Sequence, residues 1–138
     1  MIKHMVIGDI MDGSIVPLRP DMSLAEAVDH ILESGHMGLP VVDAGASLIG
    51  FLSEQDCLSY LVSSSYYADN RTEVNDIMFK EPLSVNIKDS VLDLAQSMQT
   101  GKPKNYPVCD QGRLVGLVTR SAIMRSLNHA LKTTKVAI

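Results

Sequence analysis

The chain has 138 residues, which at roughly 150 residues per domain is enough for one compact unit or two very small halves. Twelve basic residues against 16 acidic ones give a net charge of −4, so no overall positive field exists to hold nucleic acid or an anionic membrane. Aromatic residues make up 4% of the chain and Trp is absent, which leaves little surface for stacking bases. Any bound anion must therefore be held by local charges.

The two cysteines and the N-terminal residues indicate a cellular compartment. Cys57 and Cys109 each lie in an apolar run without a second cysteine or histidine at metal-binding spacing, which favours buried, reduced thiols and excludes a zinc ribbon. The first residues lack the pattern of a secretory signal, and no stretch approaches about 18 continuous apolar residues. We therefore expect a soluble cytoplasmic protein.

The sequence contains an internal repeat. The tripeptide Asp9–Met11 returns as Asp76–Met78, a displacement of 67 residues (9 to 76). The same displacement relates Ser23 to Ser90, Pro40 to Pro107, Val41 to Val108 and Asp43 to Asp110. After Gly45 and Gly112 the displacement becomes 66 (50 to 116), which a one-residue deletion in a turn explains. A single register that holds over a whole half indicates duplication.

Each repeat predicts the same order of elements. In the first, Ser23 and Glu26 form a capping-box pattern before apolar residues at helical spacing, and Gly35 ends that helix. The strands and the second helix of the first repeat are predicted at Leu39–Val42, Ser47–Leu52 and Cys57–Val62. The second repeat predicts a helix from Ser90, strands at Tyr106–Cys109 and Leu114–Val118, and a helix over Ile123–Leu131.

A leading strand is predicted before each first helix, at Ile15–Leu18 and Leu83–Ile87, so each half reads β-α-β-β-α. The polar stretch Ser63–Thr72 is interpreted as a linker, with domains at residues 1–66 and 67–138. A half of roughly 65 residues is marginally stable alone, so we expect the two halves to bury their sheets against each other. The predicted fold class is α/β (α+β), with pseudo-twofold symmetry and matched clefts between the halves.

The repeated motifs resemble a known family. They are the two Asp-Ile-Met tripeptides, the segments Leu39–Asp43 and Tyr106–Asp110, and the strand-to-helix junction Gly50–Asp56. In this order they resemble tandem CBS domains, the paired modules named after cystathionine β-synthase, over nearly the whole chain. The resemblance implies two motifs packed sheet to sheet and frequent dimerisation into a flat disc. It also implies clefts that bind adenine nucleotides or S-adenosylmethionine in many members, although many others have no known ligand.

Ser53 and Asp56 are the candidate ribose-binding pair. A carboxylate can accept hydrogen bonds from both hydroxyls of a ribose while a nearby hydroxyl adds another, and the two side chains lie three residues apart at a predicted helix start. The resemblance assigns the matching Ser/Thr-x-x-Asp motif to the ribose. The competing interpretation is a simple helix cap, a pattern that this chain also uses at Ser23 and Ser90. In the second repeat Thr119 keeps the hydroxyl but Ala122 replaces the carboxylate, so we expect unequal sites.

The remaining candidate site residues would hold the adenine and the phosphates. An apolar adenine slot is predicted from Ile15, Val16, Pro17, Leu39 and Pro40, although residues such as Leu39 could equally belong to the core. The second, weaker site is predicted at Pro82, Leu83, Tyr106, Pro107 and Thr119. Phosphate binding is predicted at Lys102, Lys104, Arg120 and His36, with ordinary surface lysines as the alternative. If the basic loop of the second repeat meets the ribose pair of the first, both halves share one ligand.

The sequence shows no catalytic machinery and no metal-binding pattern. His4, His30, His36 and His129 lack metal-ligand spacing, and neither cysteine nor Ser53 has an evident base nearby. We therefore expect no metal, no cofactor and no enzyme activity. The leading interpretation is a regulatory module that senses AMP, ADP, ATP or S-adenosylmethionine, forms a homodimer and acts on an unidentified protein. The alternative is a ligand-free dimerisation or interaction module, and a small enzyme is the least favoured interpretation.

Overall fold

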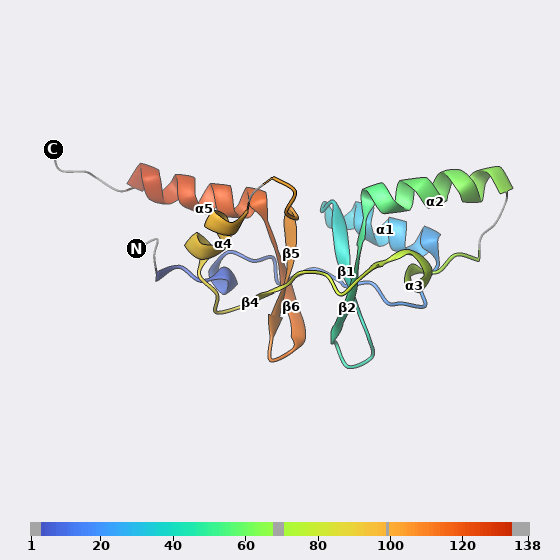
Figure 1. Ribbon diagram of the computed structural model, residues 1–138, viewed down its shortest axis with the longest axis horizontal. Coiled ribbons are helices and arrows are strands. Elements are labelled where there is room, and N and C mark those ends of the chain that lie inside the picture. Colours follow the sequence, from blue (N-terminus) through green and yellow to red (C-terminus); the bar gives the residue numbers. More distant parts are fainter. Residues whose placement is uncertain (1–3, 68–70, 99, 134–138) are drawn as a thin grey trace. The chain divides into compact units, whose positions relative to one another are not determined.

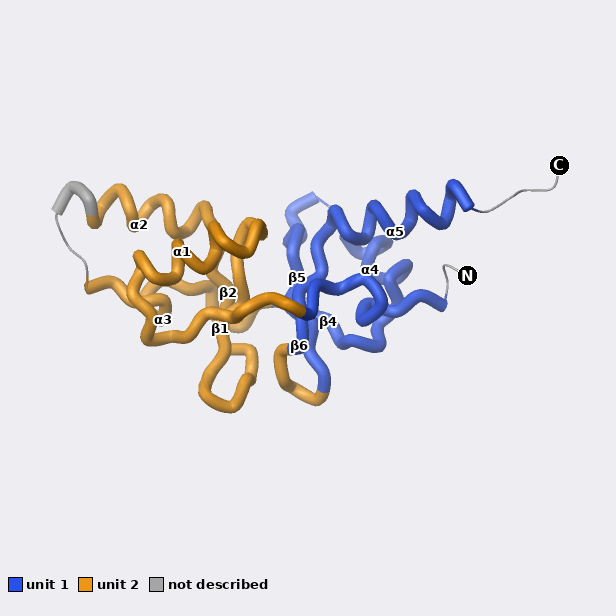
Figure 2. The backbone as a smooth tube through the Cα atoms, turned by 180° about the vertical axis from the view of Figure 1, so that it is seen from behind, with its two compact units in different colours: residues 1–13, 83–110, 115–138 blue, residues 14–82, 111–114 orange. Residues whose placement is uncertain are grey.

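The computed structural model describes residues 4–67, 71–98 and 100–133. The chain forms two compact units (Figure 2). Unit 1 comprises Met1–Gly13, Leu83–Asp110 and Val115–Ile138, and unit 2 comprises Ser14–Pro82 and Gln111–Leu114. The chain therefore passes from one unit to the other after Gly13 and after Pro82, and the short stretch Gln111–Leu114 is again assigned to unit 2.

Unit 2 is a three-stranded sheet with helices packed on it (Figure 1). Its elements are α1 (Leu24–Ser34), β1 (Gly38–Val42), β2 (Leu48–Ser53), α2 (Glu54–Tyr67), α3 (Val74–Ile77) and β3 (Phe79–Lys80). The strands are ordered β1-β2-β3 and both pairs are antiparallel. Ser23 caps α1, because its Oγ accepts a hydrogen bond from Glu26 N at 3.2 Å, and Gly35 ends α1 in the left-handed conformation with φ 73°.

Unit 1 has a corresponding sheet in the order β4-β5-β6, with β4 parallel to β5. Its elements are a 3-10 helix (Ile7–Asp9), β4 (Val85–Asn86), α4 (Val91–Ser97), β5 (Asn105–Asp110), β6 (Arg113–Thr119) and α5 (Arg120–Thr133). The turn between β5 and β6 contains only Gln111 and Gly112, both with positive φ, as a tight hairpin requires. Two three-stranded sheets combined with helices confirm the predicted α+β fold class.

Two sequence expectations need correction. The segment Ser63–Thr72 is not all linker, because α2 continues to Tyr67; residues 68–70 lie outside the described part of the chain. The predicted strand Ile15–Leu18 is a single parallel bridge between Leu18 and Val41. Pro17 has no N–H to donate to a ladder, which explains why pairing begins only after it. The corresponding strand of the second repeat, β4, is two residues long.

The segment before each leading strand packs with the other repeat: the one from the first repeat lies in unit 1, and the one from the second repeat lies in unit 2. We call residues 4–13 and 71–80 the leader segments. In unit 1, Ile7 N donates to Asp89 O at 2.9 Å; in unit 2, Val74 N donates to Met22 O at 2.9 Å. Two further pairs of equivalent hydrogen bonds follow. Gly8 N donates to Ile87 O in unit 1 as Asn75 N donates to Pro20 O in unit 2, and Val91 N donates to Met5 O as Leu24 N donates to Thr72 O. Every one of these bonds joins a leader segment to the repeat from which it does not come.

The leader segments also complete the sheets. Phe79 of β3 lies opposite Phe51 of β2, and Asp12 makes the equivalent antiparallel bridge with Leu117 of β6. This explains the repeated tripeptide Asp-Ile-Met at the start of each repeat. Its aspartate caps the short helix that it occupies, since Asp76 Oδ2 accepts from Glu73 N at 2.9 Å and Asp9 makes the same bond to Val6.

The methionine of each tripeptide lies against a glycine of the neighbouring strand. A Cβ atom on Gly50 would lie 2.5 Å from Met78 Sδ, and one on Gly116 would lie 2.7 Å from Met11 Sδ and 2.9 Å from the Asp12 carbonyl oxygen. The repeated Gly at these two positions therefore provides the space in which each leader segment packs.

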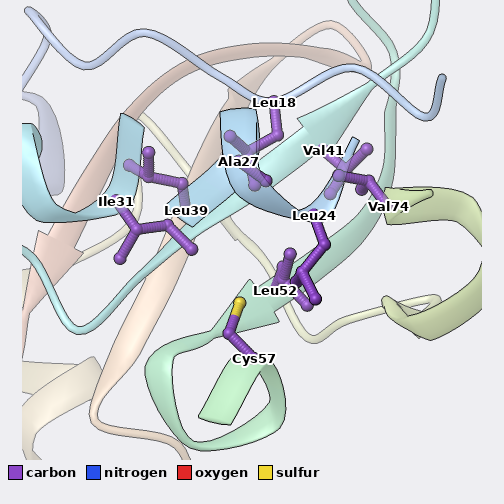
Figure 3. Packing of buried hydrophobic residues seen from close by; sticks show 9 residues of the cluster. All are labelled: Leu18, Leu24, Ala27, Ile31, Leu39, Val41, Leu52, Cys57 and Val74. Carbon is purple, nitrogen blue, oxygen red and sulfur yellow. The ribbon is translucent and has the colours of Figure 1, made fainter. Parts of the chain in front are cut away.

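Each unit has its own hydrophobic core, and the leader segments contribute to both. Val74 is fully buried in the core of unit 2, where Ile77 and Met78 pack against it; Figure 3 shows Val74 beside Val41. In unit 1 the fully buried leader residue is Ile7. The remaining buried members of the unit 2 core are Leu18, Leu24, Ala27, Ile31, Leu39, Val41, Leu52 and Cys57.

Cys57 is a core residue rather than a reactive thiol. It is 3% exposed and points toward the core from the first turns of α2 (Figure 3). Burial, followed by the negative charges of Asp56 and Glu54, raises the pKa of the Cys57 thiol from 9.0 to about 11. The thiol is therefore protonated at neutral pH, and it has no nucleophilic character there.

The exchange of leader segments predicts how fragments fold. A fragment of residues 14–82 contains nearly all of unit 2, whereas residues 1–66, of similar length, lack Val74, Ile77, Met78 and β3. Each of these apolar side chains is worth about 1.5–3 kcal/mol when fully buried, a large part of a total stability of about 5–15 kcal/mol. We expect cooperative thermal unfolding of fragment 14–82, followed by circular dichroism, and none for fragment 1–66. Equal cooperative unfolding of both fragments would show that the leader segments are dispensable.

The pKa of Cys57 predicts slow alkylation of the folded protein. At pH 8, a pKa of about 11 instead of 9.0 lowers the thiolate fraction about a hundredfold. Iodoacetamide labelling followed by peptide mass spectrometry should therefore modify Cys57 at least about a hundredfold more slowly in the native than in the denatured chain. Cys109 is half-buried and burial raises the pKa of its thiol too, so the reference rate for each cysteine is its own rate in the denatured chain. Native labelling of Cys57 at the denatured rate would contradict its burial.

Candidate functional site

The candidate site is built where β2 ends and α2 begins. Ser53, the last residue of β2, lies opposite Gly38, the first residue of β1, and Glu54 N donates to Met37 O at 2.8 Å. A Cβ atom on Gly38 would lie 2.7 Å from the Leu52 carbonyl oxygen and 2.9 Å from Ser53 Cα. Glycine at position 38 therefore lets β1 run beside β2 up to the first residue of the helix.

Ser53 caps α2, as the helix-cap interpretation predicts. Its Oγ accepts a hydrogen bond from Asp56 N at 3.1 Å. The cap uses the backbone of Asp56, and the Asp56 side chain is exposed. A serine hydroxyl that accepts one hydrogen bond still has its own hydrogen and a second lone pair. The Ser53 hydroxyl can therefore cap the helix and still form a hydrogen bond to a ligand. Ser53 and Asp56 thus bring a hydroxyl and a carboxylate to the same positive end of a helix, three residues apart.

Unit 1 repeats this junction without the carboxylate. Thr119 Oγ1 accepts from Ala122 N at 3.0 Å, and Arg120 N donates to Lys104 O at 2.8 Å. These two bonds correspond to the Ser53 cap and to the bond from Glu54 to Met37. The backbone geometry is thus the same in both units, while the methyl group of Ala122 offers no acceptor.

The residues predicted to line the adenine slot belong to unit 2, together with Ser53 and Asp56. Leu18 N donates to Pro40 O at 2.9 Å and Val42 N donates to Leu18 O at 3.0 Å, so this segment runs beside β1. Leu39 is 1% exposed and Pro40 is fully buried, as the core interpretation predicts for them. Ile15 packs against the same core and Pro17 is half-buried, whereas Val16 is 59% exposed. Among the residues predicted to line the adenine slot, Val16 is therefore the most accessible to a ligand.

The predicted phosphate-binding residues divide between the units. Lys102, Lys104 and Arg120 are exposed residues of unit 1, and the bond between Arg120 N and Lys104 O keeps the backbones of the last two adjacent. His36 belongs to unit 2, where its N–H donates to Ser34 Oγ at 3.1 Å, and it is half-buried. Shared binding of one phosphate by both groups therefore stays a prediction.

The residues predicted for the second site lie mostly in unit 1. Tyr106 is 5% exposed and Pro107 is buried, so both are largely core, and burial raises the pKa of Tyr106. Leu83 is 55% exposed, Thr119 is half-buried, and Pro82 is the last residue of unit 2 before the chain crosses. Only part of this set can therefore contact a ligand without rearrangement.

Sequence reasoning missed the structural role of Gly38 and the origin of the leader segments. A glycine directly before an apolar strand is a recognisable sign of close backbone approach. The exchange of leader segments has no comparable local signature. Over the described ranges, no cluster of three or more His, Cys, Asp or Glu side chains is placed to hold a metal ion. The helices within those ranges also lack the length and hydropathy needed to cross a bilayer.

Comparisons with known proteins identify a family and several similar structures. The profile of the CBS domain matches residues 7–63 and 74–129. The crystal structure of CBSX2 in complex with AMP superimposes with a TM-score of 0.78 and 26% identity, over 91% of this chain and 98% of that one; CBSX2 is a protein of Arabidopsis thaliana. The protein MJ1225 of Methanocaldococcus jannaschii is 23% identical over 121 residues, 88% of this chain.

The chain matches only part of some relatives. It spans 42% of the length of MJ1225. Inosine-5′-monophosphate dehydrogenase of Korarchaeum cryptofilum is 30% identical over 86% of this chain, but the match covers 24% of the dehydrogenase. That match therefore carries no catalytic activity to this chain. The family profile covers both repeats and most of the sequence, and the chain belongs to the CBS domain family, with two CBS domains in tandem.

Proposed function

We propose that this protein is a regulatory module that binds an adenosyl ligand at the start of α2. The observation that carries the proposal is the exposed Asp56 in the first turn of α2, the helix that the Ser53 hydroxyl caps. A structure of the relative CBSX2 contains AMP, which supports an adenine nucleotide as the ligand. S-adenosylmethionine presents the same ribose and adenine, so the ribose pair alone does not select among AMP, ADP, ATP and S-adenosylmethionine.

The chemistry of the ribose explains the role of each side chain. Both carboxylate oxygens of Asp56 can accept from the two ribose hydroxyls, and charge-assisted bonds of this kind are stronger than neutral ones. Ser53 Oγ retains a hydrogen to donate to a ribose oxygen while it caps the helix. Val16 and the adjoining residues Ile15 and Pro17 would provide an apolar contact for the adenine ring.

We infer that the basic residues of unit 1 serve the phosphate end of the ligand. Lys102, Lys104 and Arg120 are exposed, and Arg120 occupies the first turn of α5, where its charge is opposed by the helix dipole. A cation at an unfavourable position for its own helix is consistent with an anionic partner. His36 is the corresponding candidate from unit 2.

The proposed output is a change in assembly or in a partner protein. A ligand shifts a conformational equilibrium only by its difference in affinity for the two states. We propose that the chain forms a homodimer in the cytoplasm, that ligand binding biases its packing or its contact with a regulated protein, and that the module itself catalyses no reaction. The alternative is a ligand-free interaction module. The observed Ser53 cap favours neither function, because it is compatible with both.

Thermal unfolding separates the two functions. A ligand at a hundredfold excess over its Kd adds about 2.7 kcal/mol to the free energy of unfolding, so the midpoint should rise with AMP, ADP, ATP or S-adenosylmethionine. Asp56→Asn should abolish this rise because the amide cannot accept from both ribose hydroxyls. Asp93→Asn is the matched control, since Asp93 follows Ser90 in an identical Ser-x-x-Asp cap at α4. If all four compounds leave the wild-type midpoint unchanged, the ligand-free function is correct.

The proposed inequality of the two sites is tested by restoring the missing carboxylate. Ala122 is half-buried and already donates its N–H to Thr119, so Ala122→Asp would reproduce the junction of unit 2. We expect this variant to bind the same ligand about tenfold more tightly at the second site, measured by isothermal titration calorimetry. An unchanged second site in a variant that unfolds at the wild-type temperature would mean that unit 1 is built for another ligand.

A further inference from the structure

Methionine side chains fix both leader segments to their units. Met5 and Met11 of the leader segment 4–13 pack against the core of unit 1, and Met78 of the leader segment 71–80 packs against the core of unit 2. Met5 Sδ also accepts a hydrogen bond from Ser126 Oγ of α5 at 2.7 Å. The contacts that close each unit therefore include thioether groups, which an oxidant can convert to sulfoxides.

Met11 and Met78 occupy equivalent narrow spaces beside a strand. A Cβ atom on Gly50 of β2 would lie 2.5 Å from Met78 Sδ and 2.9 Å from Met78 Cγ. A Cβ atom on Gly116 of β6 would lie 2.7 Å from Met11 Sδ and 3.2 Å from Met11 Cγ. Neither space therefore admits one more carbon atom between the thioether and the strand. An oxygen atom added to either sulfur on this side requires the methionine to move away from the strand.

Both of these methionines are accessible to a small oxidant. Met11 and Met78 are half-buried, not sealed within the cores. Over the described ranges neither Sδ atom accepts a hydrogen bond, whereas Met5 Sδ accepts one from Ser126 and Met22 Sδ accepts one from a backbone N–H at 3.5 Å. An unshared lone pair on sulfur is the electron pair that attacks a peroxide. We therefore expect Met11 and Met78 to react in the folded chain, although more slowly than fully exposed methionines.

Oxidation by a peroxide turns the thioether into a polar group. The sulfur lone pair attacks one oxygen of hydrogen peroxide, an S–O bond forms as the O–O bond breaks, and the second oxygen leaves as water with both protons. The methionine is oxidised by two electrons and the peroxide is reduced by two. The product is a polar, chiral side chain in place of an apolar, flexible one. Its oxygen needs a hydrogen-bond donor, and burial without one is unfavourable.

We infer that Met11 and Met78 are a pair of sulfoxidation sites, and that their oxidation by a peroxide releases each leader segment from the unit that it closes. The oxidised side chain leaves the space beside its glycine, and the sheet edge formed by β3 or by Asp12 separates with it. In unit 2 the affected strand also carries the candidate site, because Gly50 precedes Ser53 by three residues in β2. The inference rests on the leader segments and is independent of the proposed ligand.

Peroxide treatment of the full wild-type chain tests this inference. Samples are taken over time; peptide mass spectrometry gives the sulfoxide fraction at each methionine, and circular dichroism gives the unfolding midpoint. Met37 and Met124, which are 48% and 65% exposed, should oxidise first and leave the midpoint unchanged. The midpoint should then fall by at least about 5 °C as Met11 and Met78 become oxidised.

Two double variants assign the effect to particular sulfur atoms. Met11→Leu with Met78→Leu removes both proposed sites with little change in apolar volume. Met37→Leu with Met124→Leu is the matched control, because it removes two exposed thioethers. Peroxide should lower the midpoint of the control as much as that of the wild type, and should leave the midpoint of the first variant unchanged.

Hydrogen exchange of the wild-type chain locates the released segments without any substitution. Exchange should rise at residues 4–13 and 71–80 after oxidation, because release of a segment exposes its backbone amides. Treatment with the two methionine sulfoxide reductases, one for each epimer, and a dithiol should restore both the exchange and the midpoint. In that step the sulfoxide oxygen leaves as water and the dithiol is oxidised to a disulfide.

Four results would overturn the inference. Met11 and Met78 that stay reduced while Met37 and Met124 are fully oxidised are not sulfoxidation sites. Unchanged exchange at residues 4–13 and 71–80 once both are oxidised would show that the sulfoxides are accommodated; this readout holds even if the first variant does not fold. A folded first variant that peroxide destabilises as much as the wild type would assign the effect to another residue, such as Cys109. Failure to recover after both methionines are reduced would do the same.

Discussion

Each unit of this protein is closed by a segment that comes from the other repeat. Val74 and Ile7 are fully buried in cores that are otherwise built mainly by the other repeat, and β3 and Asp12 complete the edges of the two sheets. A half of this size is only marginally stable alone, so such a contribution matters to its stability. The exchange therefore makes the two domains interdependent, and Gly50 and Gly116 provide the space for it, because any larger residue would collide with the methionine of the leader segment.

The same arrangement produces two equivalent strand-to-helix junctions with different chemistry. Both junctions have a capped helix start, with Ser53 or Thr119 as the cap, and a backbone bond from the first helical residue to the residue directly before β1 or β5. The fold thus forms the same backbone arrangement at both junctions. The difference between Asp56 and Ala122 lies only in a side chain that the cap does not need, so one junction can diverge in ligand binding without loss of the fold.

Most of this fold follows from local sequence patterns, and the rest depends on contacts that no local pattern encodes. Helical spacing after Ser23 and Ser90, and the alternating strands that follow, predict α1, α4 and both hairpins, because caps and periodicity act within a few residues. The short β3 and the exchanged leader segments were not predicted, since their partners lie more than twenty residues away. For the site, the Ser53 cap and its position were predictable, whereas the burial of Leu39 and Pro40 depends on how β1 packs in the sheet.

The central claim is that the two junctions share a backbone but differ in their capacity to hold a ribose. Isothermal titration calorimetry of the full wild-type chain with AMP measures this difference directly, because stoichiometry and affinity are obtained together. The account predicts one tight site per chain, with any second binding event weaker by about tenfold or more. Two sites of equal affinity would show that the carboxylate of Asp56 is not what holds the ligand, and would contradict the account.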